Sequence, residues 1–380
     1  MRVFFNAIIV QIFLSAYIYW RGWQGLPNKN YIKIPYALIY IIELIIYFIG
    51  FFTSKYLPFD ALHWFAWTGT TWMLFTIYMT VLLLLYDLFK YIDKRKKIFP
   101  PSVDLTAKKS RLIYFCLSVL LVCGVMKYGN YRFYNPVVTE MDLKIEKYSP
   151  DIKDLHIVVA SDLHAGYLID KEIISMYVDK IMEQKPDLIL LIGDIIDYDT
   201  QSLYEQRMET EFLRLKAPYG VYGVTGNHEY IDLGEGYEPR MQWLTEKAGI
   251  TLLRDTAMMV ANSFYLVGRE DDQCVTRKAL PEIMRGVDKQ YPVIVMNHEP
   301  HRLQEEVDAG ADIALYGHTH NGQMFPNNIL IHFMYELAYG YKQKENTHVY
   351  VSSGLGLAGP QYRIGTISEI VVLNVTFDKR

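Results

Sequence analysis

The sequence has few cysteines and no excess of basic charge. Its 380 residues include three cysteines, Cys116, Cys123 and Cys274, and no CxxC pair. This excludes a disulfide framework and a thiolate metal site, and we expect the three thiols to be buried bystanders. The 38 basic and 42 acidic residues give a net charge of -4. A basic nucleic-acid-binding surface is therefore not expected, and no nucleic-acid partner is predicted.

Charged residues are scarce in the first third of the chain, which is apolar and aromatic. Four apolar runs lie at about 3–20, 34–52, 64–86 and 112–126. A membrane-spanning helix needs about 20 mostly apolar residues. We therefore predict that residues 1–128 form a transmembrane region with four helices. The fourth run is short, but Arg111 and Lys127 can lengthen it by extending their side chains to the bilayer surface.

Basic residues between the runs predict an orientation. The loop between the third and fourth runs has many lysines and arginines from Lys90 to Arg111, whereas the loop before the third run has only Lys55. The positive-inside rule places the basic loop in the cytoplasm. The chain is then a multi-pass protein of the cell membrane whose C-terminal part lies outside the cytoplasm. If the fourth run does not span, that part is cytoplasmic instead.

Glu43 lies midway along the second run. An acidic residue at the centre of a bilayer is costly and by default suggests a function. The simpler interpretation is a protonated or paired carboxyl group that faces a neighbouring helix, near Thr70, Thr71 or Tyr78.

Five apolar segments in the second part of the chain end in polar residues that can bind metals. They begin at Asp154, Asp187, Gly220, Pro292 and Ala311. Near-continuous apolar strands of this kind are buried on both faces in α/β proteins, whose sites form at the carboxyl ends of strands. We predict helices at 172–184 and 240–248, and further strands at 348–352 and 369–374. The polar residues that follow the five segments are Asp162, His164, Asp194, Asn227, His228, Glu229, His298, His318 and His320.

These side chains supply imidazole, carboxylate and amide groups, and no thiolate. This mixture suits Mn²⁺, Fe or Zn²⁺ better than a soft metal. There are too many candidates for one ion, whereas a carboxylate that bridges two ions about 3.5–4 Å apart would use them all. Glycines precede Asp194, Asn227 and His318, and they permit the tight turns that bring these side chains together.

Taken together, the motifs resemble those of the calcineurin-like metallophosphoesterase superfamily over about residues 154–320. The segments Ser353-Gly354-Leu-Gly356 and Pro360-x-x-Arg363 resemble its membrane-associated bacterial branch. The resemblance implies a four-layer α/β/β/α sandwich for residues 154–380, after a linker and first strand at 129–153. The motifs are Asp162-x-His164, Gly193-Asp194-x-x-Asp197, Gly226-Asn227-His228-Glu229, Asn297-His298 and Gly317-His318-x-His320.

The resemblance also implies roles for single residues. Asp194 would bridge two metal ions, and His228 would act as general acid or electrostatic stabiliser beside the leaving group. Asp197 would orient an imidazole, Glu229 would support the site in a similar way or contact the substrate, and Arg363 would contact the substrate phosphate. A solvated acid, a helix-start carboxylate and a structural salt bridge remain the alternatives for these three. One ion would be held by Asp162, His164, Asp194 and His320, and the other by Asp194, Asn227, His298 and His318.

The reaction expected from this resemblance is hydrolysis of a phosphoester by metal-activated hydroxide. A phosphodiester or pyrophosphate is favoured over a monoester, and a lipid presented at the bilayer surface is one candidate. Two alternatives remain open: a metal-bound interaction module without turnover, and an enzyme that serves as the output domain of a membrane sensor. The motifs leave the oligomeric state and the identity of the metal undetermined.

Overall fold

The computed structural model describes the chain except residues 1, 53–56, 198–199, 232–235 and 379–380. The chain divides into two compact units. The first comprises residues 1–129 with 359–361, and the second comprises residues 130–358 with 362–380.

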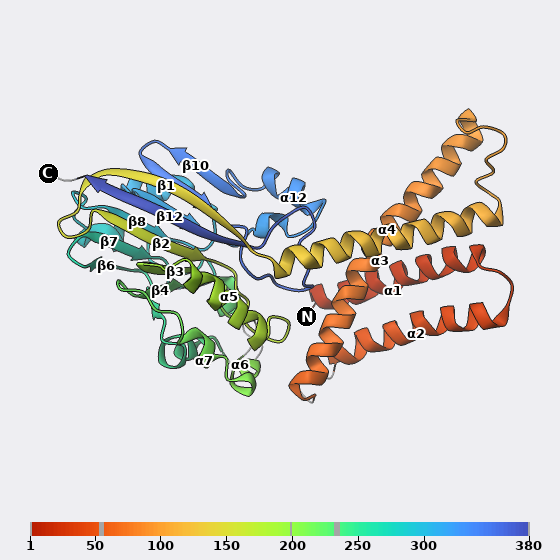
Figure 1. Cartoon of the computed structure of the whole chain (residues 1–380), viewed down its shortest axis with the longest axis horizontal. Coiled ribbons are helices and arrows are strands. Elements are labelled where there is room, and N and C mark those ends of the chain that lie inside the picture. The colour runs from red at the N-terminus through yellow and green to blue at the C-terminus, as the bar shows by residue number, and fades with distance from the viewer. Residues whose placement is uncertain (1, 53–56, 198–199, 232–235, 379–380) are drawn as a thin grey trace. The chain divides into compact units, whose positions relative to one another are not determined.

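The first unit is helical (Figure 1). Its helices are α1 (Arg2–Gly25), α2 (Asn30–Phe52), α3 (Phe59–Lys96) and α4 (Lys108–Tyr134). Each covers one of the four predicted runs and extends beyond it. Among the described residues, α3 and α4 are long and apolar enough to cross a membrane by length and composition. For α1 and α2, membrane spanning remains a prediction.

The fourth helix is much longer than the run at 112–126. It has 27 residues and ends at Tyr134, which gives it a length of about 40 Å. The helix contains no proline and continues through Gly124 and Gly129 to Tyr134, and it ends there because the residue before Pro136 disfavours helical geometry. The prediction of buried thiols is wrong for Cys116 and Cys123, which are exposed on this helix, whereas Cys274 is buried.

Two polar contacts, one partly buried and one buried, join α1 to α3. Arg21 forms an ion pair with Asp87 at 2.5 Å, and Thr76 donates a hydrogen bond to the side-chain oxygen of Gln11 at 3.1 Å. One carboxylate oxygen of Glu43 is buried and accepts no hydrogen bond from the described residues. The pairing expected for Glu43 therefore remains a prediction.

The second unit contains two six-stranded mixed sheets. The first has the order β1-β12-β2-β3-β4-β5 and the second β10-β11-β9-β8-β7-β6. The first sheet contains β1 (Val137–Tyr148), β2 (Asp154–Ala160), β3 (Leu188–Ile192), β4 (Val221–Val224), β5 (Thr251–Leu252) and β12 (Glu369–Asp378). The second contains β6 (Thr256–Val260), β7 (Phe264–Gly268), β8 (Val293–Met296), β9 (Ile313–Tyr316), β10 (Gly340–Lys344) and β11 (Thr347–Val351).

Alternating side chains of the strands build the layers. In β2, Ile157 and Val159 belong to one apolar core together with residues of β8 and β9, so the two sheets pack face to face. Val158 and Ala160 point the other way, into a core shared with α5 (Lys171–Glu183). The outer face of the second sheet packs against α10 (Leu280–Ile283) and α11 (Leu303–Ala309). Because alternate side chains of a strand face opposite ways, each sheet packs against the other sheet on one face and against helices on its outer face.

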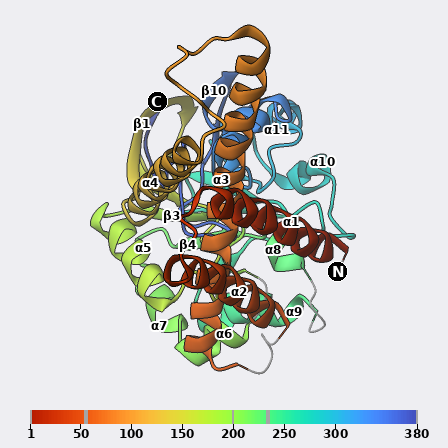
Figure 2. The same cartoon turned by 90° about the vertical axis from the view of Figure 1, so that its right-hand side faces the viewer.

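Short helices complete the second unit, and Figure 2 shows α5 and α7 on one side of the strands with α10 and α11 on the other. The predicted helix at 240–248 is present as α9 followed by a π-helical turn. The short elements are α6 (Gln201–Gln206), α7 (Glu209–Phe212), α8 (Asn227–Tyr230), α9 (Glu238–Gln242), η2 (Trp243–Lys247), η3 (Met284–Gly286), η4 (His320–Gly322), α12 (Asn327–Leu330) and η5 (Ile331–Phe333).

Strand directions bring several loops to one edge of the unit. Strands β2, β3 and β4 are parallel, as are β7, β8 and β9. Strand β12 runs antiparallel to β2, and β1 runs parallel to β12. The first residue of β1, Val137, pairs with Glu369, so β1 begins at the edge where β2, β3 and β4 end.

Candidate metal centre

The residues predicted as ligands follow the ends of five strands and meet at this edge. Asp162 and His164 follow β2, and Asp194 follows β3. Asn227 begins α8 immediately after the β4 loop, and His298 follows β8. His318 and His320 follow β9. The convergence of side chains from both sheets is the arrangement that the sequence predicted.

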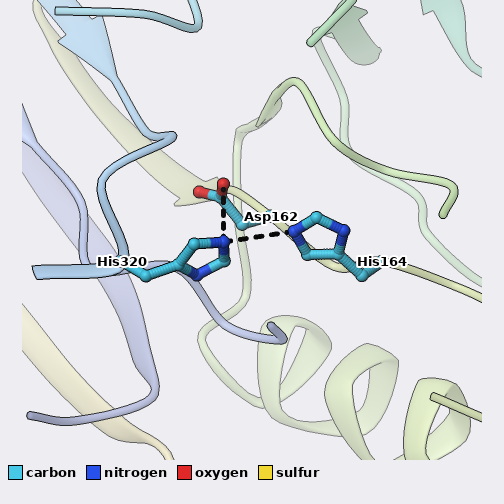
Figure 3. A group of neighbouring side chains, drawn as sticks. All are labelled: Asp162, His164 and His320. Atoms are coloured by element: carbon cyan, nitrogen blue, oxygen red, sulfur yellow. Dashed lines mark hydrogen bonds and ion pairs between the residues drawn. The ribbon is translucent and has the colours of Figure 1, made fainter. Parts of the chain in front are cut away.

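One group comprises Asp162, His164 and His320, whose potential ligand atoms lie within 4.8 Å of one another. The Nε2 atoms of His164 and His320 are 3.2 Å apart, and Nε2 of His320 is 3.5 Å from Oδ1 of Asp162 (Figure 3). Two imidazole nitrogens and a buried carboxylate thus face a common point. This donor set suits a borderline divalent cation.

A second group comprises Asp194, His298 and His318. Nε2 of His298 is 3.2 Å from Oδ2 of Asp194. Nδ1 of His318 is 2.9 Å from Oδ1 of Asn227, which adds an amide oxygen to the group. Oδ2 of Asp194 also lies 3.7 Å from Nε2 of His164. Asp194 therefore stands between the two groups, where a bridging carboxylate would have to be.

Buried nitrogen atoms at this site fit a metal ion. His298 is fully buried, and its Nδ1 is 2.7 Å from the carbonyl oxygen of Ile192. That contact orients the ring and directs Nε2 toward Asp194. Within the described residues, Nε2 of His298 has no well-aligned hydrogen-bond partner even though Oδ2 of Asp194 lies 3.2 Å away, whereas a buried polar atom normally has one. A cation bound between the two groups would supply the missing partner.

The titratable groups at the site shift one another's pKa values. Burial raises the pKa of Asp162. Burial also opposes ionisation of Asp194, but His298 and His164 outweigh this and lower its pKa. Burial lowers the pKa of His298, but the carboxylates of Asp194 and Asp162 outweigh it and raise that pKa. Burial and the charge of His298 lower the pKa of His318 to about 3. Asp194 and His318 are therefore shifted toward the ionised carboxylate and neutral imidazole that bind metals, whereas Asp162 and His298 would have to lose a proton to bind one.

The backbone at the site is held in an uncommon conformation. Five of the seven candidate ligands have positive φ angles between 48° and 69°, in the left-handed region. Such residues cost about 1–3 kcal/mol each and cluster at functional sites. The five are Asp162, His164, Asp194, His318 and His320.

The glycines beside these ligands serve two purposes. Gly193 has φ +72°, and a Cβ there would lie 2.5 Å from Nδ1 of His298. Gly226 and Gly317 do not have positive φ angles, so the predicted need for tight turns holds only for Gly193. They provide space instead, because a Cβ on Gly226 would lie 2.2 Å from Oδ1 of Asp194. A Cβ on Gly317 would lie 2.6 Å from Oδ2 of Asp162.

His228 lies beside the first group, with its ring centroid 4.5 Å from that of His164. Its Nδ1 is 2.8 Å from Oδ1 of Asp197, and Oδ1 of Asp197 is also 3.6 Å from Nδ1 of His164. Burial lowers the pKa of His228, but the bond to Asp197 and the charge of Asp194 outweigh it and raise the pKa to about 9. Asp197 therefore contacts two of the site's imidazoles, and its role in orienting them remains a prediction.

Glu229 is fully buried and ties two loops together. Its carboxylate accepts hydrogen bonds from the backbone nitrogens of Asp194 at 3.0 Å, Ile196 at 2.9 Å and Gly226 at 2.7 Å. It therefore fixes the positions of Asp194 and of the Gly226 turn. Arg363 is also fully buried, and it donates to the carbonyl oxygens of His320, Gly354 and Gly356. As substrate contacts, both remain predictions.

The sequence interpretation missed three supporting residues. Ser161 donates to Oδ2 of Asp162 at 2.6 Å, and Arg240 donates to the carbonyl oxygen of His228 at 3.2 Å. His301 is another, because its ring lies beside that of the candidate ligand His318, with the centroids 6.2 Å apart, and also stacks on Tyr335. The spacing His298-x-x-His301 was the only available signal, since arginine contacts to backbone carbonyls leave no motif.

The chain is similar in sequence to a protein family and to several known proteins. Residues 155–322 match the model of the calcineurin-like phosphoesterase family. An uncharacterized metallophosphoesterase of Campylobacter jejuni is 27% identical, and the alignment covers 98% of both chains. A Caenorhabditis elegans protein named as a metallophosphoesterase is 27% identical, over 79% of this chain and 65% of its own length.

A Danio rerio protein named as a transmembrane protein with a metallophosphoesterase domain is 28% identical. The alignment covers 69% of this chain and 62% of the zebrafish protein, so the chain spans less than two thirds of both animal relatives. The matched residues 155–322 contain every candidate ligand described above. The chain therefore contains a domain of the calcineurin-like phosphoesterase family at residues 155–322.

Proposed function

We propose that this protein is a membrane-anchored phosphoesterase that holds two divalent cations. The convergence of seven candidate ligands from five strand ends, with Asp194 between the two groups, carries the proposal. Asp162, His164, Asp194 and His320 hold one ion. Asp194, Asn227, His298 and His318 hold the other. Mn²⁺, Zn²⁺ and Fe are the candidate ions, because the ligands are imidazoles with carboxylate and amide oxygens.

Two divalent cations held by these residues would supply a water molecule activated near neutral pH and would offset charge on the phosphoryl oxygens. The chain supplies the remaining chemistry. His228 is the general acid, because its raised pKa keeps it protonated at neutral pH. Asp197 holds Nδ1 of His228, so Nε2 is the atom that delivers the proton to the leaving oxygen.

The membrane attachment is proposed from α3 and α4, which have the length and hydropathy of spanning helices. The name of the zebrafish relative adds support. We propose that α1 and α2 span as well, and that the basic residues between Lys90 and Arg111 lie in the cytoplasm. The metal centre then lies outside the cytoplasm. A phosphodiester or pyrophosphate of a lipid is the proposed substrate, because the chain delivers the site to a membrane.

The discriminating experiment is a substrate panel with the full chain in detergent. Soluble and lipid monoesters and diesters are compared in defined Mn²⁺, Zn²⁺ and Mg²⁺. We expect turnover of a diester that Asp194→Asn abolishes and His228→Ala strongly reduces. Faster turnover of soluble nucleotides than of lipid esters would refute the lipid assignment. Full biological activity of both variants would instead favour a non-catalytic interaction module.

A sensor with an enzymatic output is the second candidate. It is favoured only by Glu43, whose buried carboxylate oxygen accepts no hydrogen bond in the described part of the chain. Glu43→Gln separates the two functions, because it leaves the metal ligands intact. Unchanged turnover under all membrane conditions would exclude a sensory role for this residue.

A further inference from the structure

The second unit carries an exposed apolar segment immediately after the last candidate ligands. Residues 325–334 have the sequence Phe-Pro-Asn-Asn-Ile-Leu-Ile-His-Phe-Met, which contains no acidic residue, lysine or arginine. Its large apolar side chains are exposed to a degree that is unusual for a water-facing surface. Their exposed fractions are 50% for Phe325, 50% for Ile329, 55% for Leu330, 84% for Phe333 and 73% for Met334.

The backbone of this segment is in close contact with neighbouring backbone that follows the candidate ligands. It comprises α12 and η5, which follow the short helix η4 that begins at His320. The backbone nitrogen of Phe325 donates to the carbonyl oxygen of Ile364 at 2.7 Å. A Cβ on Gly322 would lie 2.4 Å from the backbone of Asn327, so the two backbones are in close contact. The apolar side chains are therefore displayed by an anchored structure.

The segment also belongs to the edge at which α4 delivers the chain. Only two residues separate the end of α4 at Tyr134 from β1. The first residue of β1, Val137, donates its backbone N–H to Ser368 at 2.8 Å. This is the edge at which β2 and β9 end, and the apolar segment follows β9. Near its end, α4 carries exposed tyrosines, with 60% of Tyr128 and 59% of Tyr131 accessible, as is common at membrane–water interfaces.

We propose that residues 325–334 form a bilayer-contacting surface that holds the metal centre against the lipid headgroups. An uncharged apolar segment with aromatic and aliphatic tips suits the boundary between headgroups and acyl chains. A lipid bilayer is the occupant rather than a protein, because the same chain brings a long apolar helix to this edge. The inference rests on the proposed membrane anchoring by α4, and it gives the second unit a membrane contact of its own.

The experiment measures the depth of spin labels on the full chain in lipid nanodiscs. Cys116, Cys123 and Cys274 are first replaced by alanine. Single cysteines are then introduced at Phe333 and Met334, where high exposure makes misfolding improbable. Controls at Asn262 and Asn346 occupy exposed turns before β7 and β11, at the opposite edge. A label at Leu120, an exposed residue of α4 (68%), tests the anchoring itself.

Each label is scored by its accessibility to oxygen, which concentrates in lipid, and to a water-soluble nickel chelate. We expect the ratio of oxygen accessibility to nickel-chelate accessibility to be severalfold higher at Phe333→Cys and Met334→Cys than at Asn262→Cys and Asn346→Cys. A lipid-exposed label at Leu120→Cys with water-exposed labels at the segment would overturn this proposal and leave the anchoring intact. Labels at the segment that neither reagent reaches would also overturn it, since protein would then cover the surface. A water-exposed Leu120→Cys would instead refute the anchoring.

Discussion

Replacement of Asp197 by asparagine removes a negative charge from the site while it preserves the shape of the side chain. Oδ1 of Asp197 is 2.8 Å from Nδ1 of His228, and both side chains are largely buried. The hydrogen bond from the imidazolium is therefore charge-assisted. We expect Asp197→Asn to lower the pKa of His228 and to shift the pH range in which this residue can donate a proton.

The size of the effect follows from the contact. A hydrogen bond to a charged group contributes about 1.5–3 kcal/mol, and a pKa change of one corresponds to about 1.36 kcal/mol. The pKa of His228, which its surroundings raise to about 9, should thus fall by about one to two. The acid form would then be lost as the pH rises through about 7–8 instead of about 9.

The measurement is the pH dependence of kcat/KM for the alkyl phosphoester that turns over fastest in the substrate panel. The alkaline limb should move to lower pH in Asp197→Asn. It should stay in place in Asp308→Asn, a matched change at an exposed position. A nitrophenyl ester, whose leaving group departs without a proton, should be nearly insensitive to the change. Metal content is measured in parallel, because Asp197 also lies near His164. An unmoved limb at full metal content would refute the assigned role.

Three further predictions concern the frame of the site. Gly226→Ala should displace Asp194 and lower activity about a hundredfold. The control Gly286→Ala should have no effect, because a Cβ there meets nothing within 4 Å. Equal activities of the two variants would contradict the close-packing argument. Glu369→Ala should lower the free energy of unfolding by about 3–5 kcal/mol, because Thr139, Tyr339 and Tyr350 donate hydrogen bonds to this buried carboxylate. Chemical denaturation measures this change, with a Glu→Ala variant at an exposed position as the control. Chelation should abolish turnover without loss of secondary structure, and circular dichroism during the titration would detect such a loss. A cation at a hundredfold excess over its Kd should raise the unfolding temperature by about 5–10 °C.

Periodicity and motif order allowed the sequence to predict the framework of the second unit. The five apolar segments are the strands β2, β3, β4, β8 and β9, because near-continuous apolar runs of four to seven residues suit strands that are buried on both faces. The helix predicted at 172–184 is α5, and Asp170 caps it by accepting a hydrogen bond from the backbone of Ile173 at 3.0 Å. The strands and this helix are each encoded by residues close together in the sequence, so they could be predicted without knowledge of the fold.

Contacts between distant segments could not be predicted. Glu229 resembles an ordinary helix-start carboxylate in sequence, yet it accepts bonds from the backbone of residues more than thirty positions earlier. The role of Gly226 as space for Asp194 also depends on two loops that meet only in the fold. The length of α4 was underestimated because hydropathy falls after Met126, whereas the helix continues until Pro136 prevents it.

The backbone around the candidate ligands is fixed by bonds that involve no ion. Glu229 holds Asp194 and the Gly226 turn, and Arg363 holds the carbonyl of His320. Folding therefore completes the receptor before any cation arrives, and the ions can leave and return without unfolding the chain. Because several divalent metals suit the same donors, we expect the metal that occupies the site to depend on which ions the cell supplies.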